Sequence, residues 1–221
     1  MKALVLGLVA FLAVLLVRLP AKWLLPLLPS NVKCSVAAGT VWRGSCDGLS
    51  LSDGKSAQFV IQQARWTVHP LALLRARLSA DVTVQGEWGQ ATATTMLGSG
   101  SHLVVNAMSA SGTLDRRLLP VLPAGWRGSF EARDVAFDLR SQRLLMLRGM
   151  ATVHGLQDAQ GKQYGDYQLQ LAPQGDVPAV GDLRSLAGPV SVAATVRVAQ
   201  DLNWVVDGTV NGNALSASGN F

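Results

Sequence analysis

From residue 34 onward, apolar and polar side chains alternate along the chain with a period of two. The clearest alternating runs are 82–86, 103–107, 167–171, 190–198 and 202–206. Turn signals separate such runs, at Asp53-Gly54, Gly98-Ser99-Gly100, Gln160-Gly161, Gln174-Gly175-Asp176 and Asn211-Gly212-Asn213. Successive side chains of a strand point to opposite faces, so this pattern predicts short antiparallel strands with one apolar face.

Two short stretches interrupt the alternation and predict one or two short helices. The first covers residues 70–75 and begins with Pro70, which suits a first helical turn. The second covers residues 115–119 and ends before Pro120. We therefore expect a mainly β fold, an antiparallel sheet that can curl into a groove, with these helices over one end.

The amino terminus is apolar enough to enter a membrane. Residues 3–17 carry no charge, and a helix of this length spans ~22 Å against a hydrocarbon core of ~30 Å. A cleaved signal peptide and an uncleaved signal-anchor both fit this length. The flank from Arg18 to Trp23 contains Pro20 and bulky residues where cleavage needs small ones, which favours the anchor.

These features divide the chain into three parts. Residues 1–18 form the predicted anchor, a single transmembrane helix. Residues 19–33 form a juxtamembrane connector in which Pro20, Pro26 and Pro29 oppose a long helix. Residues 34–221 form the predicted all-β domain.

Taken alone, the charges that flank the apolar run predict a cytoplasmic location for this domain. Only Lys2 precedes the apolar run, whereas Arg18, Lys22 and Lys33 follow it, and positive residues favour the cytoplasmic side. The two cysteines argue the other way. Cys34 and Cys46 are the only cysteines, and an even pair at close spacing in an exported domain indicates one disulfide, with two buried thiols as the alternative.

Composition excludes some classes of function. Charged residues make up 15% of the chain, and the net charge of +5 includes no basic run interleaved with aromatics, as a nucleic-acid surface would require. Only two glutamates occur, Glu87 and Glu131, which leaves little material for acid–base catalysis. We expect no nucleic-acid partner.

Sites for catalysis, cofactors or metals are not indicated. The sequence contains no nucleophile elbow, phosphate-binding loop or zinc-protease motif. Its three histidines, His69, His102 and His154, are scattered, and no pair of cysteines has metal-ligand spacing. The sequence therefore predicts a protein that is not an enzyme and holds no cofactor.

Five tryptophans lie in or beside predicted strands. They are Trp42, Trp66, Trp88, Trp126 and Trp204. Most are expected to anchor the core, because a large aromatic ring is costly to expose. One or two at a sheet edge could instead contact a partner.

Three segments resemble a known family. They are Gly39-Thr40-Val41-Trp42-Arg43-Gly44, flanked by Cys34 and Cys46, then residues 64–74, where a tryptophan strand meets a proline-led turn, and Pro123-Ala124-Gly125-Trp126-Arg127-Gly128. With the short anchor before them, they resemble protein N of the bacterial type II secretion system (general secretion pathway protein N).

The resemblance implies a single-pass protein of the bacterial inner membrane with most of its chain in the periplasm. Its partners would be other type II secretion components, the inner-membrane platform and the outer-membrane secretin. A rival hypothesis is a lipid-handling envelope protein, because the strand pattern also resembles AsmA-like proteins. That hypothesis predicts an uncovered apolar face that accepts acyl chains.

Overall fold

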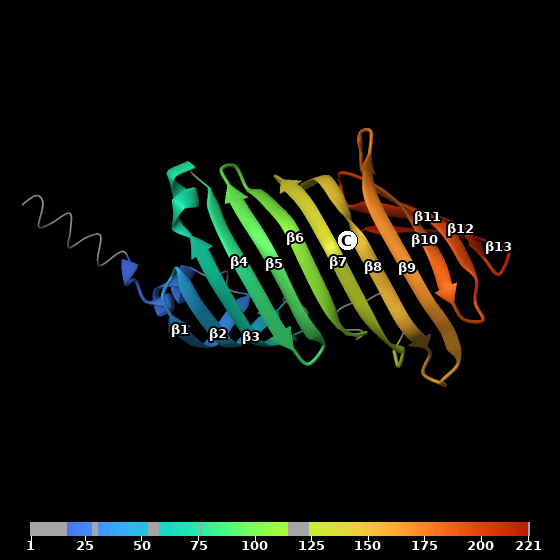
Figure 1. Ribbon diagram of the computed structural model, residues 1–221, viewed down its shortest axis with the longest axis horizontal. Helices are drawn as coiled ribbons and strands as arrows, with labels where there is room; N and C mark the ends of the chain where they lie inside the picture. The colour runs from blue at the N-terminus through green and yellow to red at the C-terminus, as the bar shows by residue number, and fades with distance from the viewer. Residues whose placement is uncertain (1–16, 28–30, 53–57, 76, 115–123, 221) are drawn as a thin grey trace, which may run out of the picture. The chain divides into compact units, whose positions relative to one another are not determined.

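The computed structural model describes residues 17–27, 31–52, 58–75, 77–114 and 124–220. The chain divides into two compact units, Met1–Glu87 and Trp88–Phe221. Each unit is an antiparallel sheet whose strands follow one another in chain order (Figure 1). This arrangement confirms the prediction of a mainly β, antiparallel fold.

The amino-terminal unit contains four strands and two short 3₁₀ helices. Its elements are η1 (Ala21–Leu27), β1 (Val32–Gly39), β2 (Arg43–Ser52), β3 (Gln58–His69), η2 (Pro70–Arg75) and β4 (Leu78–Gly86). Each strand pairs with the next in an antiparallel register, for example Gly44 with Trp66 and Trp66 with Val82. Inward side chains alternate with exposed ones along β4, as the period of two requires.

The carboxy-terminal unit contains nine strands. They are β5 (Gly89–Gly98), β6 (His102–Thr113), β7 (Arg127–Arg140), β8 (Arg143–Gln157), β9 (Gln163–Gln174), β10 (Val177–Ala187), β11 (Val192–Val198), β12 (Asn203–Val210) and β13 (Asn213–Asn220). Every strand pairs antiparallel with the next. Among the described strands of this unit, the first and last do not pair with each other, so the sheet is open.

The sheet of the carboxy-terminal unit curls around its own core. Leu144 at the start of β8 packs in one buried cluster with Ala179 of β10 and with Val196 and Val198 of β11. The backbone N–H of Leu144 donates a hydrogen bond to the carbonyl of Gln200, 2.8 Å away in the turn after β11. A flat sheet would keep strands three positions apart well separated, so these contacts show that the sheet bends between β8 and β11.

The turns follow the expected chemistry in some places and not in others. Asn211 and Gly212 both have positive φ, 50° and 80°, as the hairpin between β12 and β13 requires. Ser141 and Gln142 also have positive φ, 48° and 65°, in a hairpin that lacks a glycine signal. The predicted Asp53-Gly54 turn lies outside the described residues.

Of the two predicted helices, one is seen and the other cannot be compared with the structure. Residues 70–75 form η2, as expected. Residues 115–119 lie outside the described residues. Within the predicted connector, residues 21–27 form a short 3₁₀ helix that includes Pro26. Its first turn is closed by the Trp23 N–H, which donates to the Pro20 carbonyl over 3.1 Å.

The membrane anchor falls almost wholly outside the described residues, which begin at Val17. Within the described part of the chain, we find no helix with the length and apolarity to cross a bilayer.

Candidate functional site: an apolar pocket beside a disulfide

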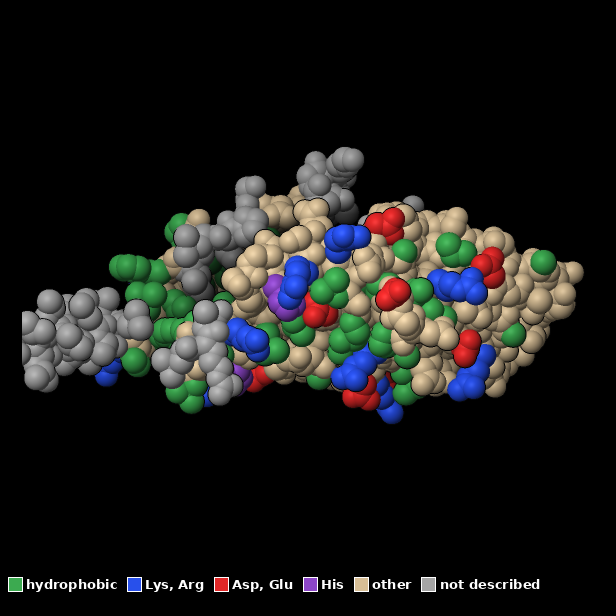
Figure 2. Space-filling view, turned by 90° about the horizontal axis from the view of Figure 1, so that it is seen from above, with side chains coloured by type: hydrophobic (Ala, Val, Ile, Leu, Met, Phe, Trp, Pro, Cys, Tyr) green, Lys and Arg blue, Asp and Glu red, His purple; other side chains and the backbone are tan. Residues whose placement is uncertain are grey.

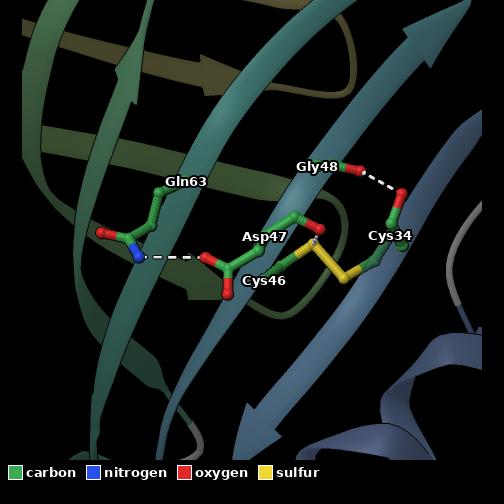
Figure 3. The surroundings of a disulfide bond; sticks show 6 residues. Cys34, Cys46, Asp47, Gly48 and Gln63 are labelled. Atoms are coloured by element: carbon green, nitrogen blue, oxygen red, sulfur yellow. Dashed lines mark hydrogen bonds between the residues drawn. A yellow bond between two sulfur atoms is a disulfide. The ribbon is translucent and has the colours of Figure 1, made fainter.

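A disulfide joins the first two strands of the amino-terminal unit. Cys34 of β1 and Cys46 of β2 are bonded, with their Cα atoms 5.9 Å apart (Figure 3). The disulfide predicted from the sequence is therefore confirmed over the alternative of two thiols.

The two faces of the sheet differ sharply around this bond. Cys46 is only 4% exposed and packs with Ile61 and Ala64 in the core of the unit. On the opposite face, the Gln63 side-chain amide donates to the Asp47 carboxylate over 2.9 Å (Figure 3). The alternation read from the sequence thus produces one apolar face and one solvated face.

The apolar face carries a pocket of about 450 Å³. It is lined by fifteen residues, all of them apolar, aromatic or cysteine. Small side chains on three strands leave much of this space, namely Ala37, Ala64 and Ala80. The volume lies within the ~300–1,000 Å³ typical of small-molecule sites.

Both short helices contribute to the pocket wall. Ala21 and Leu25 line it from η1, and Leu73 lines it from η2. Helix η1 is held against the sheet because the Val41 N–H donates to the Leu19 carbonyl over 2.9 Å, and Ala21 is 1% exposed. Part of the predicted connector therefore packs against this sheet.

Trp66 forms part of the pocket lining through a cross-strand arrangement with Gly44. Its indole N–H donates to the Val41 carbonyl over 3.0 Å, which satisfies the one polar atom of the ring. A Cβ on Gly44 would lie 2.5 Å from Cζ2 of this ring and 2.8 Å from the Thr40 carbonyl oxygen. The glycine is needed so that the ring can lie across β2 and face the pocket.

The pocket opens beside apolar side chains that remain in solvent. Leu73 is 42% exposed, and its neighbour Leu71 is 77% exposed. Trp23 of η1 is 61% exposed. Hydrophobic side chains accordingly gather on the surface of the amino-terminal unit, at the left of Figure 2.

Charge is unevenly distributed between the two units. Residues 1–87 contain nine Lys and Arg against four Asp and Glu, whereas residues 88–221 contain ten of each. The whole net charge of +5 therefore belongs to the unit that carries the pocket. Lys22 and Arg77, both exposed, are the sequence neighbours of the lining residues Ala21 and Leu78.

The five candidate tryptophans are all half-buried and belong to different surroundings. Trp42 and Trp66 line the pocket. Trp204 packs against the carboxy-terminal core, and Trp126 stacks on Tyr164 with ring centroids 4.7 Å apart. Trp88 lies just before β5. That any of the five also contacts a partner stays a prediction.

The histidines do not assemble into a site. Each faces a separate aspartate, in the pairs His69–Asp81 at 2.8 Å, His102–Asp138 at 2.8 Å and His154–Asp166 at 3.3 Å. No group of three potential metal ligands occurs among the described residues. The pKa of Asp166 is lowered because its carboxylate accepts hydrogen bonds from the Gly155 N–H and from His154.

Reasoning from the sequence predicted an apolar face that accepts acyl chains only under the rival lipid-handling hypothesis, and it did not locate this pocket. Its lining combines residues from six elements, and no single segment shows more than an ordinary apolar face. The available signal was the set of small inward residues, including Ala64 and Ala80, at positions where strands usually carry larger apolar side chains.

Comparison with known proteins gives one match. The family model for type II secretion system (T2SS) protein N matches residues 30–217. No curated protein and no solved structure matches the chain. The matched region spans every strand from β1 to β12 and most of β13. The chain, a component of protein secretion, therefore belongs to the type II secretion system protein N family.

Proposed function

We propose that the protein is a non-enzymatic, inner-membrane-anchored subunit whose domain contacts other components of the type II secretion system. The family match across residues 30–217 is the observation that carries this proposal. In the proposed topology, residues 1–18 cross the inner membrane once and residues 34–221 lie in the periplasm. The platform in the inner membrane and the secretin in the outer membrane are the proposed partners.

The disulfide supports a periplasmic location for the domain. Cys34 and Cys46 are joined in the folded protein, and such bonds persist in the periplasm but are rare in the cytoplasm. The cysteine pair thus opposes the orientation that the flanking charges alone would favour.

Strand β13 offers an edge suited to contact with another protein. Among the described strands of its unit it pairs with β12 alone, and Asn213–Asn220 contains neither proline nor a charged residue. Natural sheet edges are usually protected by such residues, because an unprotected edge can pair with another strand. We place the contact here, as a partner strand added alongside β13.

Site-specific photocrosslinking in intact cells tests this contact. A photoreactive amino acid at Ser218 of β13 should capture a secretion component. The matched control is Gln170, an exposed residue of β9 whose strand is paired on both sides, with Met150 and with Asp182. Equal capture from both positions would refute the edge contact, and capture of no secretion component from either would refute the proposed function.

A reporter fused to the carboxyl terminus tests the topology. Activity of a periplasm-specific reporter such as alkaline phosphatase is expected. Activity of a cytoplasm-specific reporter at the same position would contradict the proposed orientation.

A further inference from the structure

The chemistry of the pocket restricts what can enter it. All fifteen lining residues present hydrocarbon, aromatic rings or the disulfide, and the indole N–H of Trp66 already donates to the Val41 carbonyl. A guest therefore gains affinity chiefly by removing its own apolar surface from water. A polar ligand would lose its hydration without replacement hydrogen bonds, which is costly.

The position of the pocket in the chain brings it close to a bilayer. Ala21 lines the pocket, and the uncharged run of residues 3–17 ends only four residues earlier. Four residues span at most ~14 Å even when fully extended. If the run is inserted as proposed, the pocket and the exposed Trp23, two residues after Ala21 in the chain, lie near the membrane surface.

The charge of this unit complements one class of amphiphile. Residues 1–87 hold the entire net charge of +5, and the exposed Lys22 and Arg77 are sequence neighbours of pocket-lining residues. Basic residues at a membrane surface attract anionic headgroups. An apolar pocket beside basic residues matches a molecule with an acyl chain and an acidic headgroup.

We propose that the pocket between η1, η2 and the inner face of β1–β4 binds one acyl chain of an anionic lipid. The chain lies against the disulfide and Trp66, and the headgroup stays outside beside Lys22 and Arg77. This inference goes beyond the secretion function and uses the proposed anchor only to bring the pocket to its ligand. Contacts of β13 with secretion components can hold even where this inference fails.

Photolabelling from the bilayer tests the proposal on the full chain. The protein is reconstituted into phosphatidylglycerol vesicles that contain a phospholipid with a photoreactive diazirine at the end of one acyl chain. After irradiation, peptides are mapped by mass spectrometry. Labels are expected on pocket residues of β3 and β4, such as Ala64, Val68 and Ala80.

Two pocket variants and one control make the test specific. Ala80→Phe fills the pocket and should lower labelling more than about tenfold, because each methylene kept in water weakens binding about fourfold. Thr83→Phe puts the same side chain on the exposed face of β4 and should leave labelling unchanged. Leu73→Glu places a charge on the rim at a side chain 42% exposed, where folding tolerates it, and should also reduce labelling.

A charge variant tests the headgroup. Replacing Lys22 and Arg77 by Gln should lower labelling from phosphatidylglycerol by about fivefold for each charge removed. Phosphatidylcholine vesicles should label the native protein correspondingly less. Equal labelling from both lipids would overturn the anionic headgroup.

Other outcomes overturn the acyl-chain site itself. Labels confined to residues 1–18 would show contact of the anchor alone. Undiminished labelling of a folded Leu73→Glu variant would show that lipid reaches the sheet without using the pocket. A photoreactive residue at Leu73 could instead capture a partner protein in intact cells. That result, with no lipid label in the pocket, would show that the pocket binds a protein and not an acyl chain.

Discussion

Reduction of the disulfide provides a direct test of how the amino-terminal unit is stabilised. Cys34 and Cys46 are twelve positions apart in the sequence and close the hairpin formed by β1 and β2. In the chain-entropy model, removal of a cross-link over such a loop costs about 3 kcal/mol. Reduction leaves both sulfur atoms in place, so the packing of the buried Cys46 changes little and the cross-link is isolated.

Hydrogen exchange followed by mass spectrometry resolves this effect within the full chain. A loss of 3 kcal/mol corresponds to about a 150-fold rise in the hydrogen-exchange rate of amides that exchange only when the unit unfolds. We expect this rise in β1 and β2, where the backbone hydrogen bonds depend on the cross-linked hairpin. Peptides from β10 to β12 serve as the internal control, because they belong to the separate carboxy-terminal unit.

The result that would refute this reasoning is equal protection of β1 and β2 in the oxidised and reduced protein. It would mean that the packing of Ile61, Ala64 and their neighbours alone sets the stability of the unit. A uniform rise across both units would equally contradict the assignment of the effect to one hairpin. The Cys34→Ala/Cys46→Ala double variant should reproduce reduction, with a further loss from the missing buried sulfur.

Three further predictions concern single side chains. Gly44→Ala should destabilise the amino-terminal unit by about 1–3 kcal/mol, because the added methyl overlaps the Trp66 ring; an unchanged urea midpoint would contradict this packing. Trp66→Phe should cost at least about 1 kcal/mol in the same assay, since the Val41 carbonyl loses its indole donor. Asp166 has a lowered pKa, so its contribution to stability is present above its unfolded value of about 3.9 and is lost as pH falls towards the folded pKa. The thermal midpoint of the native protein should therefore fall more between pH 6 and pH 3 than that of Asp166→Asn, and parallel profiles would refute the role of this carboxylate.

Local sequence determined the elements of this fold with good accuracy. The alternation in 82–86 and 167–171 places these residues in β4 and β9, and that in 202–206 falls in β12 except for Leu202, which lies in the turn before it. Pro70 begins the short helix η2, and Asn211-Gly212 forms the expected hairpin turn. These features depend on the conformational preferences of adjacent residues, and those preferences follow from the residue types alone.

Other local features were not visible because tertiary contacts override local preference. Ser141 and Gln142 adopt positive φ without a glycine, in a hairpin whose flanking strands pair from Arg140 and Arg143 onward. Pro26 lies within η1, which packs against β1 and β2. In both places the pairing or packing of neighbouring elements fixes a conformation that the residues themselves do not favour.

What the sequence determined by itself is the strand pattern, the apolar face, the cysteine pair and the family resemblance, all of which rest on adjacent residues or short motifs. Only the tertiary structure decided where that face is filled and where it is hollow. In the carboxy-terminal unit the sheet curls until Leu144 reaches Val196 and Val198, and the apolar face becomes a core. In the amino-terminal unit, Ala37, Ala64 and Ala80 leave space between η1 and η2. The same alternation encodes both faces, because it specifies which side chains point inward and says nothing about what lies opposite them.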